Sequence, residues 1–234
     1  MRVGIIGDGK MGRTVAALAA ERGHEVTAVL TEVENEGGAA IAAGGLAGAE
    51  VAIEFTEPRA APANALACVR AGVPVVVGTT GWYERLPEIR DAVAAGKGAL
   101  LYAPNFSPGV ALFIELVRRA GRLFTDPAWF DAHLIETHHA AKKDAPSGTA
   151  ILLGRAFEAG TARKPPITSI RTGHVPGTHE LMLDGAFEQI RLVHAARDRR
   201  VFADGALRAA DWLRGRRGVF TMRDVLGLGP EGEG

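Results

Sequence analysis

The densest cluster of chemically active groups lies in residues 138–149, His-His-Ala-Ala-Lys-Lys-Asp-Ala-Pro-Ser-Gly-Thr. Two adjacent imidazoles, His138 and His139, take up or release a proton near neutral pH, and Lys142 adds a fixed positive charge beside them. The Ser147-Gly148-Thr149 run reads as the start of a helix, where backbone N–H groups and the helix dipole favour a bound carboxylate or phosphate. This spacing predicts a site for a small anionic substrate that must accept a proton.

The same residue types fit two other interpretations. Ser147 is a favoured N-cap residue, so the segment also suits a solvated basic loop followed by an ordinary capped helix. Adjacent histidines can bind a metal, but no carboxylate or cysteine lies at a convincing ligand spacing, and Lys142 would repel a cation. We therefore expect no metal at this site.

The composition bounds the class of protein. With 234 residues, 47% of them hydrophobic, the chain can form one large domain or two modest ones with real cores. Its 27 basic and 27 acidic side chains balance, so we expect neither nucleic acid nor a membrane surface as a partner. The single Cys68 excludes an internal disulfide, and no signal peptide or membrane-spanning run is visible. We expect a cytoplasmic protein.

Hydrophobic periodicity predicts an α/β fold in two parts. Short apolar runs alternate with helical patterns in the first half, which is typical of a Rossmann-type doubly wound parallel sheet. The expected strands there are 3–6, 25–30, 51–55, 73–77 and 99–102, and the expected helices are 11–22, 61–71 and 84–95. A second α+β domain with a mixed sheet follows, with a helix at 110–123 and strands at 130–137, 167–171, 180–183 and 189–194. A last helix is expected at 206–214.

A glycine-rich loop, Gly7-Asp8-Gly9-Lys10-Met11-Gly12, follows the first strand and opens the first helix. In that position glycines permit a tight turn, close approach of a pyrophosphate and close packing of helix on strand, so the loop predicts a dinucleotide site. Glu32, just after the second strand, favours the free 2′-hydroxyl of NADH, whereas Lys10 favours the 2′-phosphate of NADPH. The sequence leaves this preference open.

Two further motifs end neighbouring strands of the predicted sheet. Gly78-Thr79-Thr80 follows the fourth strand, and Ala103-Pro104-Asn105-Phe106 follows the fifth. Ordinary turn chemistry explains each motif by itself. Their common edge with the glycine loop nevertheless favours contacts with an extended cofactor, because ligands bind at the carboxyl ends of parallel strands.

Taken together, these residues resemble the 4-hydroxy-tetrahydrodipicolinate reductase (dihydrodipicolinate reductase) family over nearly the whole chain. The resemblance rests on the glycine loop and on seven other motifs, at 54–56, 78–81, 105–107, 136–142, 144–149, 171–179 and 202–206. The string His-His-x-x-Lys-x-Asp-Ala-Pro-Ser-Gly-Thr is the most specific of them.

The resemblance implies fold, chemistry and roles. It implies a dinucleotide-binding domain of residues 1–107 and 208–234, and a domain of residues 108–207 that binds substrate and builds a homotetramer. It implies hydride transfer from NADH or NADPH to C4 of a cyclic imine dicarboxylate, in diaminopimelate and lysine biosynthesis. By position, His138 is the general acid, while His139, Lys142, Ser147, Gly148 and Thr149 hold the substrate. The chemistry adds a catalytic role for Lys142, whose positive charge can stabilise negative charge beside His138. The expected cofactor contacts are Gly7, Asp8, Gly9, Lys10, Met11, Gly12, Glu32, Gly78, Thr79, Thr80, Ala103, Asn105 and Phe106.

Two alternatives remain at this point. Another NAD(P)-dependent imine or amino-acid dehydrogenase would keep the fold and cofactor but change the substrate. A dinucleotide sensor would keep the fold without turnover, although sensing does not require the histidine and lysine cluster.

Overall fold

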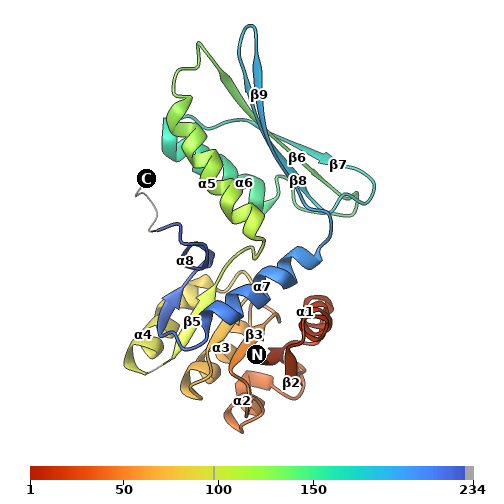
Figure 1. Ribbon diagram of the computed structural model, residues 1–234, viewed down its shortest axis with the longest axis vertical. Coiled ribbons are helices and arrows are strands. Elements are labelled where there is room, and N and C mark those ends of the chain that lie inside the picture. Colours follow the sequence, from red (N-terminus) through yellow and green to blue (C-terminus); the bar gives the residue numbers. More distant parts are fainter. Residues whose placement is uncertain (97, 230–234) are drawn as a thin grey trace. The chain divides into compact units, whose positions relative to one another are not determined.

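The structure is a computed structural model that describes residues 1–96 and 98–229. It divides into two compact units (Figure 1), one made of Met1–Ser107 with the chain from Arg200 onward, the other of Pro108–Arg199. The return to the first unit falls at Arg200 and not at the expected residue 208, because one continuous helix begins there. Of the expected segment 208–234, residues 230–234 lie outside the described residues.

The first unit contains a six-stranded sheet in which every strand is parallel to its neighbours. Its strands, in the spatial order β10-β5-β4-β3-β1-β2, are β1 (Arg2–Ile6), β2 (Glu25–Leu30), β3 (Val51–Glu54), β4 (Val75–Val77), β5 (Ala99–Tyr102) and β10 (Gly218–Phe220). The chain reverses its direction of travel across the sheet at β1, which lies between β2 and β3. Such a switch point is where open parallel sheets bind ligands, and the predicted doubly wound sheet is confirmed.

Helices cover both faces of this sheet (Figure 1). They are α1 (Lys10–Glu21), α2 (Ala39–Ala42), α3 (Ala61–Arg70), α4 (Leu86–Ala95), α7 (Arg200–Leu213) and α8 (Met222–Val225), with two 3₁₀ turns at Glu36–Gly38 and Tyr83–Arg85. The α1 and α7 helices pack together on one face, whereas α3 packs between α2 and α4 on the other. Sequence periodicity missed α2, β10 and α8, since elements of three or four residues are too short to show a period.

The second unit has a four-stranded sheet in the order β7-β6-β8-β9. Its strands are β6 (Asp131–His138), β7 (Ile167–Arg171), β8 (Thr178–Asp184) and β9 (Gln189–Ala195). The β7 strand is parallel to β6, whereas β8 is antiparallel to both of its neighbours, β6 and β9, so the sheet is mixed as predicted. The helices α5 (Pro108–Leu123) and α6 (Gly148–Thr161) pack together and cover one face (Figure 1). Within residues 108–199, all of which the structure describes, no helix covers the other face.

Alternation along the strands separates these two faces of the second sheet. The covered face carries the core, in which Leu134 of β6 and Leu181 of β8 meet Phe113 of α5 and Phe157 of α6. The same face of β6 continues into Glu136 and His138, which are also buried. On this face, the first half of β6 therefore contributes to the hydrophobic core, and its second half contributes to a polar site.

No helix in residues 1–96 or 98–229 is both long and apolar enough to cross a membrane.

Two glycines allow α5 and α6 to cross closely. A Cβ at Gly121 would lie 2.4 Å from the carbonyl oxygen of Phe157, and a Cβ at Gly160 would lie 2.6 Å from the backbone nitrogen of Arg122. Both clashes involve backbone atoms, which cannot rotate away. The crossing, and with it the helical layer under the site, depends on the missing side chains.

We expect Gly121→Ala to lower the free energy of unfolding by about 1–3 kcal/mol, the usual cost of overpacking a core. Gly154→Ala in α6 is the matched control, since its Cβ would make ordinary contacts at 3.5 Å and a helical alanine gains about 0.5–1 kcal/mol over glycine. Thermal unfolding followed by circular dichroism measures both variants. Equal midpoints for the two would contradict this account of the crossing.

Candidate active site

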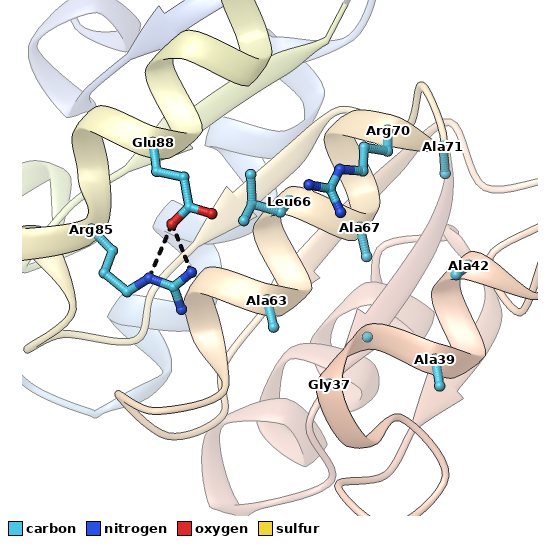
Figure 2. Close-up of a pocket in the computed structure, with 11 residues that line it drawn as sticks. Gly37, Ala39, Ala42, Ala63, Leu66, Ala67, Arg70, Ala71, Arg85 and Glu88 are labelled. Atoms are coloured by element: carbon cyan, nitrogen blue, oxygen red, sulfur yellow. Dashed lines mark hydrogen bonds and ion pairs between the residues drawn. The ribbon is translucent and has the colours of Figure 1, made fainter.

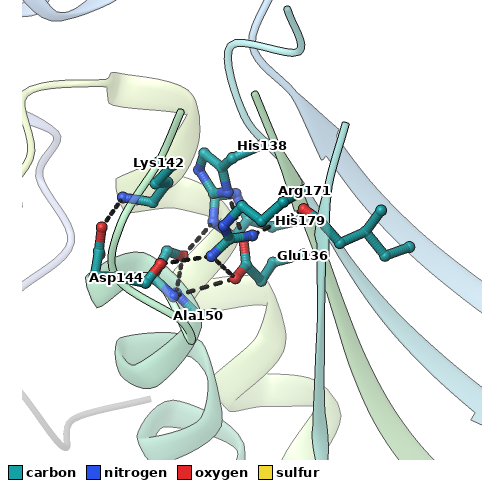
Figure 3. A network of polar contacts seen from close by, with 9 residues as sticks. Glu136, His138, Lys142, Asp144, Ala150, Arg171 and His179 are labelled. Carbon is teal, nitrogen blue, oxygen red and sulfur yellow. Dashed lines mark hydrogen bonds and ion pairs between the residues drawn. The ribbon is translucent and has the colours of Figure 1, made fainter. Parts of the chain in front are cut away.

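The polar end of β6 forms the centre of the site (Figure 3). Glu136 and His138 are two residues apart on one strand, so both side chains point to the same face of the sheet. Strand pairing then brings two more polar side chains beside them, because His138 is paired with Arg171 of β7 and Glu136 with His179 of β8. Four groups from three strands thus share one buried surface.

The Glu136 carboxylate is only 1% exposed and accepts hydrogen bonds from three segments. Arg171 donates twice, through Nη2 to Oε1 at 2.7 Å and through Nη1 to Oε2 at 3.0 Å. The backbone N–H of Ser147 donates to Oε1 at 3.2 Å, and His138 donates to Oε2 through Nδ1. The buried charge is therefore satisfied by a bidentate guanidinium, an amide and an imidazole.

The His138 ring lies in a narrow slot. It meets the His179 ring edge to face at a centroid distance of 5.2 Å, while Nε2 faces the backbone of Gly177. A Cβ at Gly177 would lie 3.0 Å from Nε2, and this glycine also has φ +153°, which few other residues adopt. Glycine at 177 therefore leaves room at the ring nitrogen that Glu136 does not hold.

The surroundings shift the pKa of each titratable group in this cluster. Burial by itself would raise the pKa of Glu136, but hydrogen bonds from Arg171, Ser169 and His138 lower it to about 2. Burial lowers the pKa of His138 and outweighs the opposing effect of Glu136. Burial and the neighbouring His138 lower the pKa of His179 to about 4. At neutral pH in the free protein, Glu136 is ionised and both imidazoles are neutral.

The loop after β6 is tied back to the same cluster. Lys142 Nζ lies 2.7 Å from Asp144 Oδ1, and the carbonyl of Asp144 accepts from Arg171 Nη2 at 2.6 Å. The Lys142 side chain is partly buried, with 22% of its surface exposed. The ammonium group thus lies at the border between the buried cluster and the solvent.

The helix start at Ser147 is confirmed, and the Ser147 hydroxyl has a structural role there. Its Oγ accepts from the N–H of Ala150 at 3.2 Å as the N-cap of α6, and it lies 3.2 Å from His179 Nε2. Ser147 is 2% exposed, so the hydroxyl makes its hydrogen bonds to other groups of the protein. Gly148 is exposed and has open space where a side chain would lie, while Thr149 and His139 are half-buried.

The expected catalytic pair and substrate residues thus come together in one unit, but the sequence hypothesis missed three members of the site. Glu136, Arg171 and His179 were noticed only as parts of motifs. A signal for Glu136 was present, since alternation along a strand puts it on the same face as His138. Arg171 and His179 depend on the order of β6, β7 and β8, which periodicity does not specify.

In the first unit, the glycine loop fits a dinucleotide. Gly7 has φ +104°, and a Cβ there would lie 2.2 Å from the carbonyl oxygen of Phe55. A Cβ at Gly12 would lie 1.8 Å from the carbonyl oxygen of Gly7, so α1 packs directly on the loop. Gly9, in contrast, faces open space at the start of α1, where the backbone can approach a pyrophosphate. Beside it, Asp8 and Lys10 are exposed and Met11 is half-buried.

The other expected cofactor residues divide into open and occupied positions. Thr80 is exposed, whereas the Thr79 hydroxyl is buried and accepts from the N–H of Thr56 at 2.8 Å. Gly78 leaves space for the Phe55 ring, because a Cβ there would lie 2.1 Å from that ring. Ala103 and Phe106 are buried, and Phe106 meets the Phe55 ring edge to face. The Asn105 side chain accepts from the N–H of Ser107 at 2.8 Å and so shapes its own turn.

Glu32 lies beyond the end of β2 and is held by a cation from another loop. Its Oε1 is 2.6 Å from Nη2 of Arg59, which precedes α3. Both side chains are largely exposed, so solvent and salt weaken the pair and either partner can exchange it for a ligand. The position expected to contact the ribose therefore has a carboxylate and a guanidinium group side by side.

A hollow of about 500 Å³ lies elsewhere on this unit (Figure 2). Its walls come from the Gly37–Gly38 turn, the outer face of α3 with Arg70, and the paired Arg85 and Glu88. None of the residues expected to bind the cofactor lines this hollow. Across residues 1–96 and 98–229, no three histidine, cysteine, aspartate or glutamate side chains gather in a way that would hold a metal ion.

Comparison with known proteins identifies the family. Residues 1–106 match the model described as dihydrodipicolinate reductase, N-terminus, and residues 109–226 match dihydrodipicolinate reductase, C-terminus. The chain belongs to the dihydrodipicolinate reductase family. A 4-hydroxy-tetrahydrodipicolinate reductase of Thiobacillus denitrificans is 38% identical, with 97% of this chain and 99% of that protein covered. One from Xanthomonas campestris pv. campestris is 42% identical, with 93% and 94% covered.

The solved structures support the fold of this dihydrodipicolinate reductase family member. A dihydrodipicolinate reductase from Paenisporosarcina sp. TG-14, solved with dipicolinate bound, superposes with a TM-score of 0.78. The two chains are 22% identical, and the match covers 94% of this chain and 97% of that one. An aspartate dehydrogenase from Thermotoga maritima superposes with a TM-score of 0.50 at 10% identity, so its fold resembles this one less closely.

Proposed function

We propose that this chain is an NAD(P)H-dependent reductase that acts on the cyclic imine dicarboxylate formed from 4-hydroxy-tetrahydrodipicolinate. The products are tetrahydrodipicolinate, water and the oxidised nicotinamide, and the reaction belongs to diaminopimelate and lysine biosynthesis. Support comes from the full-length match to the family and from a buried histidine with one ring nitrogen available. The second observation carries the chemistry, because reduction of a conjugated imine also requires a proton donor.

The histidine completes the electron and proton balance. NAD(P)H, when bound, would supply the hydride for C4 of the ring. The C3–C4 double bond then gives its electron pair to C3, through the enamine that includes the ring nitrogen. His138, protonated when the dianionic substrate binds beside it, gives the Nε2 proton to C3 and returns to the neutral form. The orientation is set by Glu136, which holds Nδ1 and so leaves Nε2 as the donor.

The second unit supplies the groups that hold a dicarboxylate. Lys142 places an ammonium group at the border of the buried cluster, where a substrate carboxylate can compete with the exposed Asp144 for it. The start of α6 at Gly148 and Thr149 adds the positive end of the helix dipole. Because the Ser147 hydroxyl already caps this helix, we assign carboxylate binding mainly to Lys142, His139 and the helix start.

The reaction can be tested directly in a coupled assay. Aspartate semialdehyde and pyruvate are combined with the upstream synthase, and loss of reduced nicotinamide absorbance is followed with NADH and with NADPH. We expect oxidation of the cofactor only when the synthase is present. Oxidation of neither cofactor, together with turnover of an amino acid such as aspartate, would favour the alternative dehydrogenase.

We expect His138→Gln to lower kcat by about 10²–10⁴-fold, the usual contribution of a general acid, with the affinity for cofactor retained. His24→Gln is the matched control, since His24 precedes β2 in the first unit, at the end of the strand opposite to Glu32. The assay above gives kcat, and fluorescence titration gives the dissociation constant of the cofactor. Normal turnover in the His138 variant would remove its proposed role, and turnover lost equally in both variants would point to general damage.

We also propose a homotetramer built through the open face of the second sheet. That face carries Ile170, 41% exposed, and Val193, 55% exposed, and a second copy of the same face would cover these apolar side chains. Light scattering should report the mass of four chains. Val193→Glu should reduce that mass, whereas Leu116→Glu, at an equally exposed site on α5, should not. A single-chain mass for the unmodified protein would contradict the proposal.

The Glu32–Arg59 pair offers a contact for either cofactor. Glu32 can accept from the ribose hydroxyls of NADH, while Arg59 can turn from Glu32 to the 2′-phosphate of NADPH. We expect Arg59→Ala to weaken binding of NADPH and of adenosine 2′,5′-bisphosphate by about 10- to 100-fold, with NADH affected little. The reason is that the unpaired Glu32 would then repel the phosphate.

Isothermal titration calorimetry with the bisphosphate and with AMP measures this difference without turnover. Arg85→Ala is the control, because Arg85 forms a comparably exposed pair with Glu88. If Lys10→Ala removes the preference for phosphate and Arg59→Ala does not, the phosphate is held by Lys10 and the proposal for Arg59 is wrong.

The cytoplasm is the compartment we propose for this reaction. The single Cys68 is buried and free, so the fold needs no oxidising environment. The balanced charge gives no general attraction to nucleic acid.

A further inference from the structure

We propose that Glu136 is a positioning residue that selects which nitrogen of His138 delivers the proton, and that Arg171 holds Glu136 in place and limits its effect on the imidazole. The inference rests on the proposed function for its kinetic consequences. Its structural part, the tautomer and orientation of His138, can be measured in the free protein.

The selection follows from hydrogen-bonding capacity. An ionised carboxylate can only accept, so Nδ1 of His138 must carry the hydrogen in the bond to Glu136. In the neutral ring Nε2 then has a free lone pair, and in the protonated ring Nε2–H is the only donor not engaged by Glu136. Without the carboxylate the neutral ring could place its hydrogen on either nitrogen. Glu136 thus fixes the reactive nitrogen before a substrate arrives.

The geometry is held by backbone and not by flexible side chains alone. Glu136 and His138 share β6, and β7 presents Arg171 directly beside His138 in the parallel register. The N–H of Ser147 fixes the other side of the carboxylate, and Ser147 caps α6. Rotation of Glu136 away from the imidazole would break the bidentate contact with Arg171 as well.

Charged and titratable groups face His138 from each neighbouring segment. They are Glu136 on β6, Arg171 on β7, His179 on β8 and Lys142 in the loop that follows β6. Burial lowers the pKa of His138, Glu136 raises it, and Lys142 and Arg171 lower it further. The free enzyme therefore holds a neutral imidazole next to a carboxylate whose charge is largely balanced by Arg171.

Because Arg171 balances the charge of Glu136, its role goes beyond holding that carboxylate in position. A bound dianion adds negative charge near Lys142, which offsets one of the two cations. The field of Glu136 can then stabilise the imidazolium, so protonation of His138 is coupled to occupation of the site. Arg171 keeps that stabilisation from acting in the empty site.

The test is the pH profile of kcat/KM in two variants that should shift its alkaline limb in opposite directions. Glu136→Gln removes the group that raises the pKa of His138, so the alkaline limb should move to lower pH by about 1 unit. Arg171→Gln removes a group that lowers this pKa, so the limb should move to higher pH. At neutral pH we expect kcat of the Glu136 variant to fall by about 10²-fold, with the cofactor affinity unchanged.

A merely structural role predicts a different result, in which both variants lose activity or stability and neither limb moves. Glu88→Gln is the matched control, since it neutralises a glutamate that is paired with an arginine in the first unit. Limbs that stay in place, or that move in the same direction in both variants, would overturn the proposal.

A second measurement does not depend on turnover or on the survival of a variant. In ¹⁵N-detected histidine spectra of the free wild-type protein, His138 should show a protonated Nδ1 and an unprotonated Nε2 at neutral pH. The opposite tautomer, or a mixture of both, would overturn the proposal even if the reductase activity is established. Absence of that activity with the expected tautomer would instead count against the proposed function.

Discussion

A buried carboxylate is the constraint on which the second unit depends. Glu136 is ionised and almost fully excluded from solvent, and such a charge is tolerated only when its oxygens are fully hydrogen-bonded. The donors come from His138 on the same strand, Arg171 on the next strand and the backbone of Ser147. Satisfying one charge therefore fixes the relative positions of β6, β7 and the start of α6.

That requirement also shapes the loop with the chemically active residues. Arg171 reaches past Glu136 to the carbonyl of Asp144, whose side chain pairs with Lys142. The loop between β6 and α6 is consequently anchored at its middle and at its end. Structural and chemical roles are combined here, because the groups that order the loop also set the charge around His138.

The first unit also has a buried carboxyl group, but there burial favours the neutral form. Glu54, at the end of β3, is fully buried, and burial raises its pKa, which favours the neutral acid. Thr56 and Asn64 donate to its Oε1, and Asn64 in turn accepts from Asn35. Thr79 joins the cluster through the N–H of Thr56. Loops that follow β2, β3 and β4 are thereby fastened at the edge where the glycine loop lies.

The amino-acid sequence by itself determined the local features of this protein. Hydrophobic periods and turn residues gave both sheets and most helices, and the motifs gave the glycine loop, His138, Lys142 and the cap at Ser147. Only the tertiary structure decided that Arg171 and His179 join Glu136, since their proximity depends on strand order and register, which local patterns do not encode. The tertiary structure also decided that the Thr79 and Ser147 hydroxyls are already hydrogen-bonded within the protein, because burial depends on what packs around a residue.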